Sequence, residues 1–403
     1  EHHYAEFDTL AGVECIEKTM IALDKKHISK LPWTATGIPR EDVRRIARKN
    51  HGKEWFKKLE CTAEQQKKLE LVYHGGYTHG YRNIIGEVIK GLIEAYDFSS
   101  SYPFVLLAKK YPSEKFYSVP NTDPQNILND MEDYAFMFKF IAVGIKLKNN
   151  VKMPSLQYSK CVKTINEVND NGRILCSDYI EIYGTEQDLD VWMRQYDFKG
   201  KICVEVECSK KDYLPRWLTD YIFKLYEDKT KLKGVDPILY AIAKAKLNSV
   251  YGMHVQKPVK DCIEEDYNTG KYVVEKVLFD VEYQKYLDKK STVLPYAVGV
   301  WCTAYAFHNL FELGECAEMW LYSDTDSCYG MGWNHEKIKE YNDNCKKLLQ
   351  ANNYGCVIHN GREYWLGIAE LDGVYNKFVT LGAKRYCCLL YTSPSPRDGL
   401  LSR

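Results

Sequence analysis

The sequence predicts an α+β protein with separate sheet-rich and helix-rich parts, and three observations support this class. Between Tyr134 and Val206, short runs of strand-forming residues alternate with turn signals such as Asn169-Asp170-Asn171-Gly172 and Lys199-Gly200. A helix start stands at Asp236-Pro237, where Asp is suited to the N-cap and Pro to the first turn. Apolar residues flank 322–327 on both sides, which predicts a tight hairpin. A sheet-bearing segment is therefore expected between more helical parts.

Composition narrows the class of protein without naming a partner. The 403 residues are 45% hydrophobic and 27% charged, which excludes a disordered or collagen-like chain. The 55 Lys and Arg residues balance 55 Asp and Glu residues, so overall attraction to phosphate is absent and a nucleic-acid binder would need local basic patches. The 14 cysteines are scattered without zinc-finger spacing, which favours buried, reduced thiols in a cytosol.

The sequence has unusual ends and one strongly apolar stretch. The chain begins at Glu1 without a methionine, and no signal peptide is visible, so a fragment whose true start is missing is expected. After Leu390 the composition loses its periodicity and apolar content, which is typical of a non-native tail. The stretch from Val293 to Phe311 contains Pro, Thr, His and Asn, so it is expected to be a buried core segment with no role in a membrane.

In the first third of the chain, the pattern predicts a helix from Glu1 to about Lys30, ended by Leu31-Pro32. The next stretch, from Arg44 to Lys58, is basic and amphipathic; a solvated helix face is favoured over a groove for a nucleic-acid backbone. An apolar run from Ile93 ends at Asp97, and Ser99 to Ser101 are expected to cap a helix that continues through Lys110.

In the last part of the chain, the helix that starts at Asp236 is expected to run through Tyr251 and to end at Gly252. The segment from Val255 to Lys290 is predicted to be a strand-rich excursion, with a turn at Asn268-Thr269-Gly270. No internal repeat is visible.

The hairpin at 322–327 carries two aspartates, Asp324 and Asp326, at its tip. Carboxylates two residues apart on an extended turn can place hard oxygen ligands near one Mg²⁺ ion. Such pairs also occur commonly as caps or solvated loop residues, so alone this pair is a weak signal.

Asp97 has two interpretations. It follows an apolar strand, where an unpaired carboxylate is costly unless a metal or a cation compensates its charge. The other interpretation is a helix N-cap, which is favoured when the residue is taken alone. Aspartates from two strand ends could jointly hold two metal ions suited to in-line phosphoryl transfer.

A third segment places three functional side chains on one helical stripe. Lys244, Asn248 and Tyr251 are spaced i, i+4 and i+7, while Ile238, Ala241 and Ala245 are expected to form another face. An ammonium, an amide and an aromatic ring on one stripe suit a triphosphate, a base edge and a base plane. A surface lysine beside a half-buried tyrosine is the alternative.

In this order, the three segments resemble motifs A, B and C of the B-family DNA polymerases. They are Asp97 to Pro103 (DxxSxYP), Lys244 to Gly252 (KxxxNSxYG) and Tyr322 to Ser327 (YxDTDS). Tyr73 to Gly76 resembles the YxGG linker motif, and Lys384 to Tyr386 resembles the primer-gripping KxY motif. The resemblance is closest to the protein-primed branch of phages and linear plasmids.

One further segment, Tyr4 to Asp8, resembles the third exonuclease motif YxxxD, so the resemblance extends from Tyr4 to Leu390. The first two exonuclease motifs are absent, so Tyr4 and Asp8 alone are expected not to edit. The sequence also holds nothing that resembles a thumb after Tyr386.

The resemblance implies a role for individual residues. Asp97, Asp324 and Asp326 would be catalytic, and Asp97, Asp326 and the Phe98 carbonyl would hold two Mg²⁺ ions, for which Mn²⁺ can substitute. The nucleotide-binding residues would be Tyr102, Lys231, Lys244 and Tyr251, with Lys229 as an alternative to Lys231. The DNA-binding residues would be Tyr73, Gly75, Gly76, Ser100, Asn248, Gly252, Thr325, Lys384 and Tyr386.

The resemblance also implies a domain organisation: a right-hand palm with an antiparallel sheet, helical fingers and two insertions. Its expected boundaries are 1–30 for an exonuclease remnant, 31–108 for the linker and first palm segment, 109–215 for palm strands and the first insertion, 216–254 for the fingers, 255–290 for the second insertion, 291–390 for the palm and 391–403 for the tail.

The partners that the resemblance implies are primer-template DNA, deoxynucleoside triphosphates and a terminal protein that supplies the priming hydroxyl. A monomer in the cytoplasm of a bacterial host is expected. Two alternatives remain: an inactive remnant that only binds DNA or terminal protein, and another two-metal enzyme such as a nuclease. The helix from Lys244 to Gly252 argues against a nuclease, because hydrolysis needs no face for an incoming base.

Overall fold

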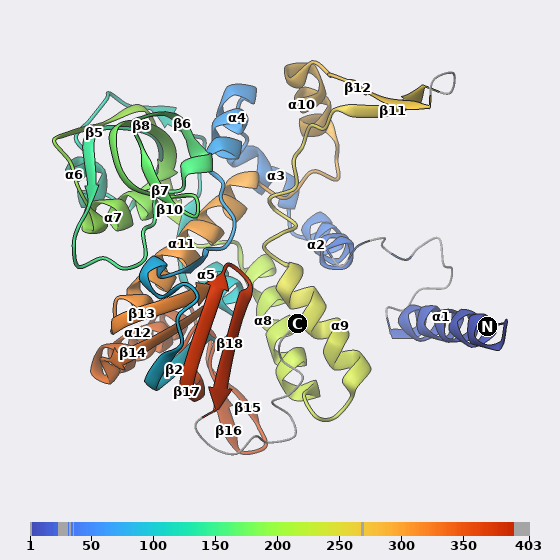
Figure 1. The fold of residues 1–403 in the computed structure, drawn as a ribbon. Coiled ribbons are helices and arrows are strands. Elements are labelled where there is room, and N and C mark those ends of the chain that lie inside the picture. The colour runs from blue at the N-terminus through green and yellow to red at the C-terminus, as the bar shows by residue number, and fades with distance from the viewer. Residues whose placement is uncertain (1, 23–30, 32–33, 35, 267–269, 391–403) are drawn as a thin grey trace.

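The computed structural model describes residues 2–22, 31, 34, 36–266 and 270–390. Its centre is a six-stranded antiparallel sheet in the order β1-β13-β14-β2-β17-β18 (Figure 1). The strands are β1 (Thr78–Gly80), β2 (Ile89–Phe98), β13 (Ala317–Asp324), β14 (Ser327–Trp333), β17 (Ala369–Gly382) and β18 (Arg385–Leu390). Strands far apart in the sequence are therefore neighbours, and the chain returns to this sheet three times.

A second antiparallel sheet of eight strands forms a separate layer (Figure 1). Its strands are β3 (Tyr111–Pro112), β4 (Tyr117–Ser118), β5 (Tyr134–Leu147), β6 (Cys161–Ile165), β7 (Val168–Asp170), β8 (Arg173–Thr185), β9 (Tyr196–Asp197) and β10 (Gly200–Asp212). Helices α6 (Pro124–Asn129) and α7 (Glu186–Gln195) accompany it, with a short 3₁₀ turn at Tyr158–Lys160. The strand-rich segment predicted between Tyr134 and Val206 is confirmed.

The β7–β8 hairpin shows why this part of the prediction succeeded. Asn171 and Gly172 form its two-residue turn, with φ angles of 46° and 81°. Both angles are positive, as a type I′ turn requires, and Asn-Gly is the sequence that adopts them most readily. A local signal of this kind acts without help from the rest of the fold.

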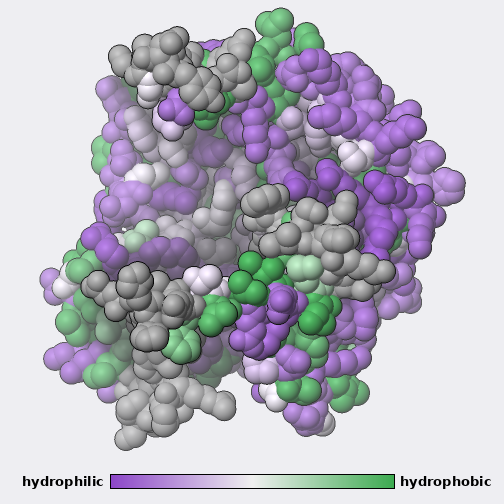
Figure 2. Space-filling model, turned by 90° about the vertical axis from the view of Figure 1, so that its right-hand side faces the viewer, coloured by the Kyte–Doolittle hydropathy of each residue, from purple (hydrophilic) through white to green (hydrophobic). Residues whose placement is uncertain are grey.

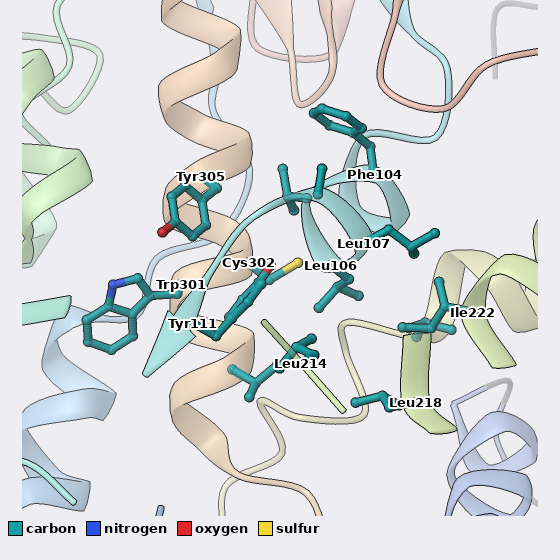
Figure 3. Packing of buried hydrophobic residues seen from close by; sticks show 14 of the residues in the cluster. Phe104, Leu106, Leu107, Tyr111, Leu214, Leu218, Ile222, Trp301, Cys302 and Tyr305 are labelled. Carbon is teal, nitrogen blue, oxygen red and sulfur yellow. The ribbon is translucent and has the colours of Figure 1, made fainter. Parts of the chain in front are cut away.

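A group of helices packs together beside the central sheet. They are α2 (Gly37–Lys49), α3 (Gly52–Lys58), α4 (Ala63–Val72), α5 (Ser101–Ala108), α8 (Arg216–Leu232), α9 (Pro237–Ser249), α10 (Phe279–Asp288), α11 (Tyr296–Gly314) and α12 (His335–Ala351). Of these, α11 and α12 make the main contacts with the sheet. Figure 3 shows Phe104, Leu106 and Leu107 of α5 packed between α8 and α11, in the largest core cluster. This packing fixes the helix that leaves β2.

The remaining elements are peripheral. Helix α1 (His2–Ala22) lies at the N-terminus, and a 3₁₀ turn (Arg82–Ile84) follows β1. Strands β11 (Cys262–Asp266) and β12 (Lys271–Glu275) form one hairpin, and β15 (Val357–His359) and β16 (Arg362–Tyr364) form another. Figure 2 shows a face of the molecule that is mostly hydrophilic, with hydrophobic residues in a few separate clusters.

A buried ionic network joins the second sheet to α11. Glu186, at the start of α7, accepts hydrogen bonds from Trp301 Nε1 and from the Phe136 backbone, each at 2.8 Å. Lys211 of β10 lies 2.8 Å from the same carboxylate, and both charged side chains are almost completely buried. Loss of Glu186 or Lys211 would leave the other charge buried and uncompensated, so removal of either partner should destabilise the contact between the second sheet and α11.

Several expectations for single elements can now be compared with the structure. Asp236 caps α9 as predicted, accepting hydrogen bonds from the backbone of Ile238 and Leu239, and Pro237 occupies the first turn. The helix ends at Ser249, two residues earlier than expected. The expected first helix is confirmed from His2 to Ala22, and its remaining residues, 23–30, lie outside the described part, as do Asn268 and Thr269 of the predicted turn and the tail at 391–403.

The prediction that Ser99 to Ser101 cap the next helix was wrong. Helix α5 starts at Ser101, but Ser100 makes no capping hydrogen bond with its side chain and has a φ of 57°. A left-handed backbone turns the chain there, and the Ser100 hydroxyl is directed to a lysine described below.

The apolar stretch from Val293 to Phe311 is a core segment as predicted, because nearly all of α11 is buried. No helix among the described residues is long and apolar enough to span a membrane. The cysteines whose surroundings are described are all unpaired, as expected.

Candidate active site at the end of the central sheet

The central sheet brings Asp97 and Asp326 together at the ends of two neighbouring strands. Asp97, near the end of β2, is opposite Ser327, the first residue of β14. The Phe98 backbone N–H donates to the carbonyl oxygen of Asp326 at 3.0 Å. This hydrogen bond joins Asp326 to the residue that follows Asp97. It therefore holds the two aspartates near each other, although 229 positions separate them in the sequence.

The turn that carries Asp326 is tight, as the sequence predicts. Asp324 and Ser327 are opposite each other across β13 and β14, which leaves Thr325 and Asp326 as the two turn residues. Thr325 has a φ of 64°, and its backbone N–H donates to the Tyr77 carbonyl at 2.7 Å. This hydrogen bond ties the turn to the segment that precedes β1.

Burial and neighbouring negative charges disfavour the ionised form of both carboxyl groups. Burial, then the nearby charges of Asp326 and Asp372, raise the pKa of Asp97 to about 8, against the opposing effect of Lys229. Burial and then the charge of Asp324 raise the pKa of Asp326 to about 6. Two buried carboxylates at one site have this effect, because each charged form is desolvated and repelled.

This donor set fits a divalent cation. Carboxylate oxygens are the ligands that Mg²⁺ prefers, and a bound cation would relieve the repulsion between the two charges. Phe98, whose carbonyl is expected to be the third protein ligand, is buried beside Asp97 on β2. Among the described residues, no group of three or more His, Cys, Asp or Glu side chains forms a metal cluster, so the protein would supply a pair with open positions.

Asp324 is in a different environment from the pair. It forms an ion pair with Lys384, and it accepts hydrogen bonds from Thr78 Oγ1 at 3.3 Å and Thr325 Oγ1 at 3.2 Å. Its charge is thus compensated by protein groups. This arrangement suits a residue that supports the turn more than one that needs a metal ion.

The segment around Lys384 and Tyr386 packs directly beneath this turn. The Lys384 backbone N–H donates to the hydroxyl of Tyr322 at 2.8 Å. The Tyr386 ring lies 4.7 Å from that of Tyr322, and its hydroxyl is 3.2 Å from that of Tyr329. Two sequence motifs identified separately therefore form one contact surface.

The expected nucleotide face lies on α9 and just after it. Lys244 and Asn248 are exposed, and Tyr251 is half-buried. The Tyr251 ring stacks on the ring of Tyr102, the second residue of α5, with centroids 4.1 Å apart. Gly252 follows at the end of this face, and a Cβ placed there would be 3.6 Å from Thr36.

The expected apolar face of α9 was wrong. Ile238 is 48% exposed, and the buried positions of the helix are Ala243 and Leu247, followed by Val250. These residues are also spaced i, i+4 and i+7, and Leu247 and Val250 pack into the largest core cluster together with residues of α8 and α5. The sequence offers two apolar stripes, and only the neighbouring helices decide which one is covered.

Of the two lysines considered for the second phosphate ligand, Lys229 lies at the aspartate pair and Lys231 does not. Lys229 donates to the Ser100 hydroxyl at 3.0 Å, and burial and then the charge of Lys244 lower its pKa. Lys231 has a 54% exposed side chain that lies 3.5 Å from Glu227. Positions i and i+2 of a helix point about 200° apart, so only one of them can face the site.

The linker segment contacts the same turn. Gly76 is so close to Thr325 that a Cβ at position 76 would be 2.7 Å from its Cγ2 atom, whereas a Cβ at Gly75 would meet nothing within 4 Å. Tyr73 is half-buried and makes an edge contact with Tyr296 of α11, with centroids 6.1 Å apart. Among the expected DNA-binding residues of this segment, Gly76 is thus the one under steric constraint.

Sequence reasoning missed two acidic residues on β17. Glu370 is opposite Asp97 in the sheet, and Asp372 follows at an irregularity in the pairing. Both raise the pKa of Asp97. The available signal was two acids spaced by two near the start of a strand-forming segment.

The exonuclease motif residues Tyr4 and Asp8 lie on α1, and their side chains are outside the described part of the structure. Their expected role therefore stays a prediction.

Comparisons with known proteins agree with this geometry. The family profile described as "DNA polymerase type B, organellar and viral" matches residues 46–296. The DNA polymerase of Streptococcus phage Cp-1 is 23% identical over 249 residues, covering 60% of this chain and 40% of the phage protein.

Solved structures of Phi29 DNA polymerase share the fold. The orthorhombic crystal form has a TM-score of 0.64 at 18% identity, covering 93% of this chain and 59% of that one. The complex with single-stranded DNA has a TM-score of 0.67 at 18% identity, covering 91% of this chain and 58% of that one. The chain thus spans less than two thirds of the length of these relatives. Because the family profile covers more than half of the chain, this protein belongs to the family of type B DNA polymerases, organellar and viral.

Proposed function

We propose that this chain is the palm and fingers part of a DNA-directed DNA polymerase, which adds deoxynucleotides to a primer 3′-hydroxyl under the direction of a template. The observation that carries the proposal is the pair Asp97 and Asp326, whose raised pKa values mark two carboxyls without a protein cation sufficient to balance them. The pair lies beside a cationic and aromatic face formed by Lys229, Lys244 and Tyr251.

In this proposal each group acts on a different part of the reacting complex. Asp97, Asp326 and the Phe98 carbonyl hold two Mg²⁺ ions, or Mn²⁺ in their place, and the ions supply charge neutralisation for phosphoryl transfer when bound. Lys244 and Lys229 bind the triphosphate of the incoming nucleotide, with Lys231 as the less favoured ligand. Tyr102 and Tyr251 contact its sugar and base.

The remaining residues position the nucleic acid. Lys384 and Tyr386 bind the primer strand near Asp324, because their contacts with the catalytic turn place them at its edge. Tyr73, Gly75, Gly76, Ser100, Asn248, Gly252 and Thr325 face the template strand. The partners are therefore primer-template DNA and deoxynucleoside triphosphates, and the chain acts as a monomer.

We further propose protein priming within a phage-infected bacterial cytoplasm. Support comes from the eight-stranded sheet, which falls within residues 109–215, and from the hairpin of β11 and β12, which falls within 255–290. In this division the first insertion contacts a terminal protein and the second encloses DNA. Residues 1–30 would be the remnant of an exonuclease domain, 31–108 and 291–390 palm, and 216–254 fingers.

Primer extension tests the proposal. Purified protein is incubated with a 5′-labelled primer-template, one deoxynucleotide and Mg²⁺, and single-nucleotide products are resolved on a gel; the Asp326→Asn variant is the control. Template-matched addition by the parent and none by the variant is expected. A shift in DNA mobility without any addition would instead identify a remnant that only binds nucleic acid, and primer shortening would identify a nuclease.

A further inference from the structure

A polar cavity lies away from the aspartate pair, between α2 and the chain segments on either side of the β11–β12 hairpin. Its volume is about 170 Å³, far more than the roughly 10–15 Å³ that one water molecule needs. Three cationic side chains line it: Arg40 and Arg44 from α2, and Lys257 from the loop after α9. Figure 1 shows α2 beside this loop.

The two arginines are held in place by neutral groups. Arg40 contacts the side-chain oxygen of Gln256, and Arg44 Nε donates to the Ser291 carbonyl at 3.1 Å. Within the described part of the chain, neither makes an ion pair with a carboxylate; Asp42, on the same helix, is engaged by Arg45 and Lys246. Burial and then the charge of Arg40 lower the pKa of Arg44, as expected for neighbouring cations that lack a counter-ion.

The inner wall of the cavity carries a polar atom without a partner. His254 is 2% exposed, and its Nδ1 lies 3.3 Å from the Pro295 carbonyl. A carbonyl can only accept, so Nδ1 donates, and Nε2 of the neutral ring is left as an acceptor. Among the described residues Nε2 has no hydrogen-bond partner. Burial lowers the pKa of His254 to about 4, so the ring stays neutral at pH 7.

We propose that this cavity binds a phosphate group whose molecule also presents an O–H or N–H donor to His254, and that the phosphate belongs to the backbone of a single DNA strand. Arg40 and Arg44, which have no carboxylate partner among the described residues, and the unsatisfied acceptor of His254 define a ligand with both features; Lys257 is the third cation of the wall and lies 3.8 Å from Glu70. A strand supplies the phosphate from its backbone and the donor from a base edge. The assignment to DNA rests on the proposed polymerase function.

The cavity lies next to the segment that carries the proposed nucleotide face. His254 follows Tyr251 by three residues, and its neighbour Met253 also lines the cavity. A phosphate bound to Arg44 and Lys257 would therefore be anchored directly to the end of the segment that carries Asn248 and Tyr251. The strand would be fixed in register relative to the nucleotide face.

Three other residues of the basic stretch from Arg44 to Lys58 have structural roles, and its remaining basic side chains, Arg45, Arg48, Lys49, Lys57 and Lys58, are exposed. Lys53 donates to the carbonyls of Leu287, Lys289 and Thr292 at 2.7, 3.1 and 3.3 Å. Trp55 packs edge-on against Trp217, and Phe56 is buried. Most of the basic side chains of the stretch thus form a solvated face, as the sequence favours, and Arg44 is its member at the cavity.

The test measures binding to the full chain, with polymerisation assayed in parallel. The probes are a fluorescent twelve-residue oligothymidylate, inorganic phosphate and sulfate, with the anions followed by calorimetry. The variants are Arg44→Gln, Lys257→Gln and His254→Phe. Arg48→Gln is the matched control, because Arg48 lies one turn from Arg44 on α2, is exposed and does not line the cavity.

Arg44→Gln and Lys257→Gln should each weaken oligothymidylate binding by about tenfold and reduce its salt slope by about 0.7, the value for one lost contact to a single strand. Arg48→Gln should change it by less than about twofold. Phosphate, which carries an O–H at neutral pH, should bind better than sulfate, and His254→Phe should abolish that preference. Lys257→Gln keeps the test valid if Arg44→Gln misfolds, because the Lys257 side chain is 67% exposed.

Equal losses of oligothymidylate binding in Arg44→Gln and Arg48→Gln would contradict binding at the cavity, since the effect would then be a general attraction of basic residues for DNA. Binding of phosphate but not of the oligonucleotide would keep the phosphate site and overturn its assignment to a strand. Primer extension separates the two proposals: an active enzyme without cavity-dependent binding contradicts only this inference, and cavity-dependent binding without extension contradicts only the polymerase.

Discussion

The ring of Tyr102 is stacked on the ring of Tyr251, with an angle of 20° between their planes and 4.1 Å between their centroids. The two tyrosines come from α5 and from the residues just after α9, and they are the groups proposed to contact the sugar and the base of the nucleotide. In this arrangement the two rings contact each other, so each ring supports the position of the other.

The first prediction concerns sugar selection by Tyr102. Replacement by Val removes a flat ring expected to clash with a 2′-hydroxyl, and relief of about 3 to 4 kcal/mol would change discrimination against ribonucleotides by roughly several hundredfold. The measurement is kcat/KM for one ribonucleotide and the matching deoxynucleotide. Tyr102→Phe keeps the ring and should keep the ratio; an unchanged ratio in Tyr102→Val would show that the ring only stabilises the core.

The second prediction concerns the aspartate pair. Asp97→Asn and Asp326→Asn should each abolish nucleotide addition yet leave thermal stability unchanged or slightly higher, because burial and like charge already disfavour both ionised carboxyls. Addition rates and melting temperatures are measured together. Asp343→Asn, an exposed member of a pair with Lys339, is the control for loss of one charge. Near-parental addition by either site variant would contradict the metal assignment.

The third prediction compares Lys229 with Lys231. Lys229→Met should lower kcat/KM for the deoxynucleotide by about 10- to 100-fold, since a charge-assisted contact to the triphosphate contributes about 1.5 to 3 kcal/mol. It should also move the pH profile of nucleotide addition to higher pH. Lys229 lowers the pKa of Asp97, so without this lysine the carboxyl ionises at a higher pH. Lys231→Met, which removes the same charge two residues away, should stay within about twofold. Equal effects of the two variants would contradict the geometry.

The fourth prediction uses two adjacent glycines. Gly76→Ala places a Cβ 2.7 Å from Thr325 Cγ2 and 2.9 Å from Thr325 Oγ1, so the catalytic turn must shift. We expect a loss of about 1 to 3 kcal/mol in the free energy of unfolding and a larger loss of nucleotide addition. A Cβ at position 75 has no atom within 4 Å, so Gly75→Ala should change neither the free energy of unfolding nor nucleotide addition. Denaturant melts and addition rates of both variants test this, and equal behaviour would exclude the contact.

The fifth prediction concerns the pH dependence of stability through His254. Its pKa is lowered from 6.5 to about 4 by burial, and the ring faces a cavity lined by Arg40, Arg44 and Lys257. Between pH 6.5 and 4 the unfolded chain binds a proton that the folded protein does not, so stability falls as the pH falls through this window, by on the order of 3 kcal/mol at the end.

Denaturant melts at pH 7, 5.5 and 4.5 measure this effect. The His254→Phe variant has no proton to bind in the unfolded state, so its stability should fall less steeply across the same pH range. Parallel curves for the parent and the variant would show that His254 is not buried as a neutral ring.

Local chemistry in the sequence determined much of the fold and the identity of the site. The Asp236 cap and the Asn171-Gly172 turn were predictable, because neighbouring backbone and side-chain groups decide each of them. The hairpin at Thr325 and Asp326 was predictable for the same reason, as were the strand-rich region and the buried α11. Asp97, Asp326, Lys244 and Tyr251 could be named because each stands in a contiguous motif.

Only the tertiary structure decided how these pieces meet. It placed Lys229 at Ser100 and Lys231 beside Glu227, buried the stripe from Ala243 to Val250 and not that of Ile238, and brought Gly76 against Thr325. It also brought Glu370 opposite Asp97 and enclosed His254 among cations. These outcomes depend on which strands pair and which helix faces are covered, and such contacts join residues hundreds of positions apart, where sequence spacing carries no information about distance.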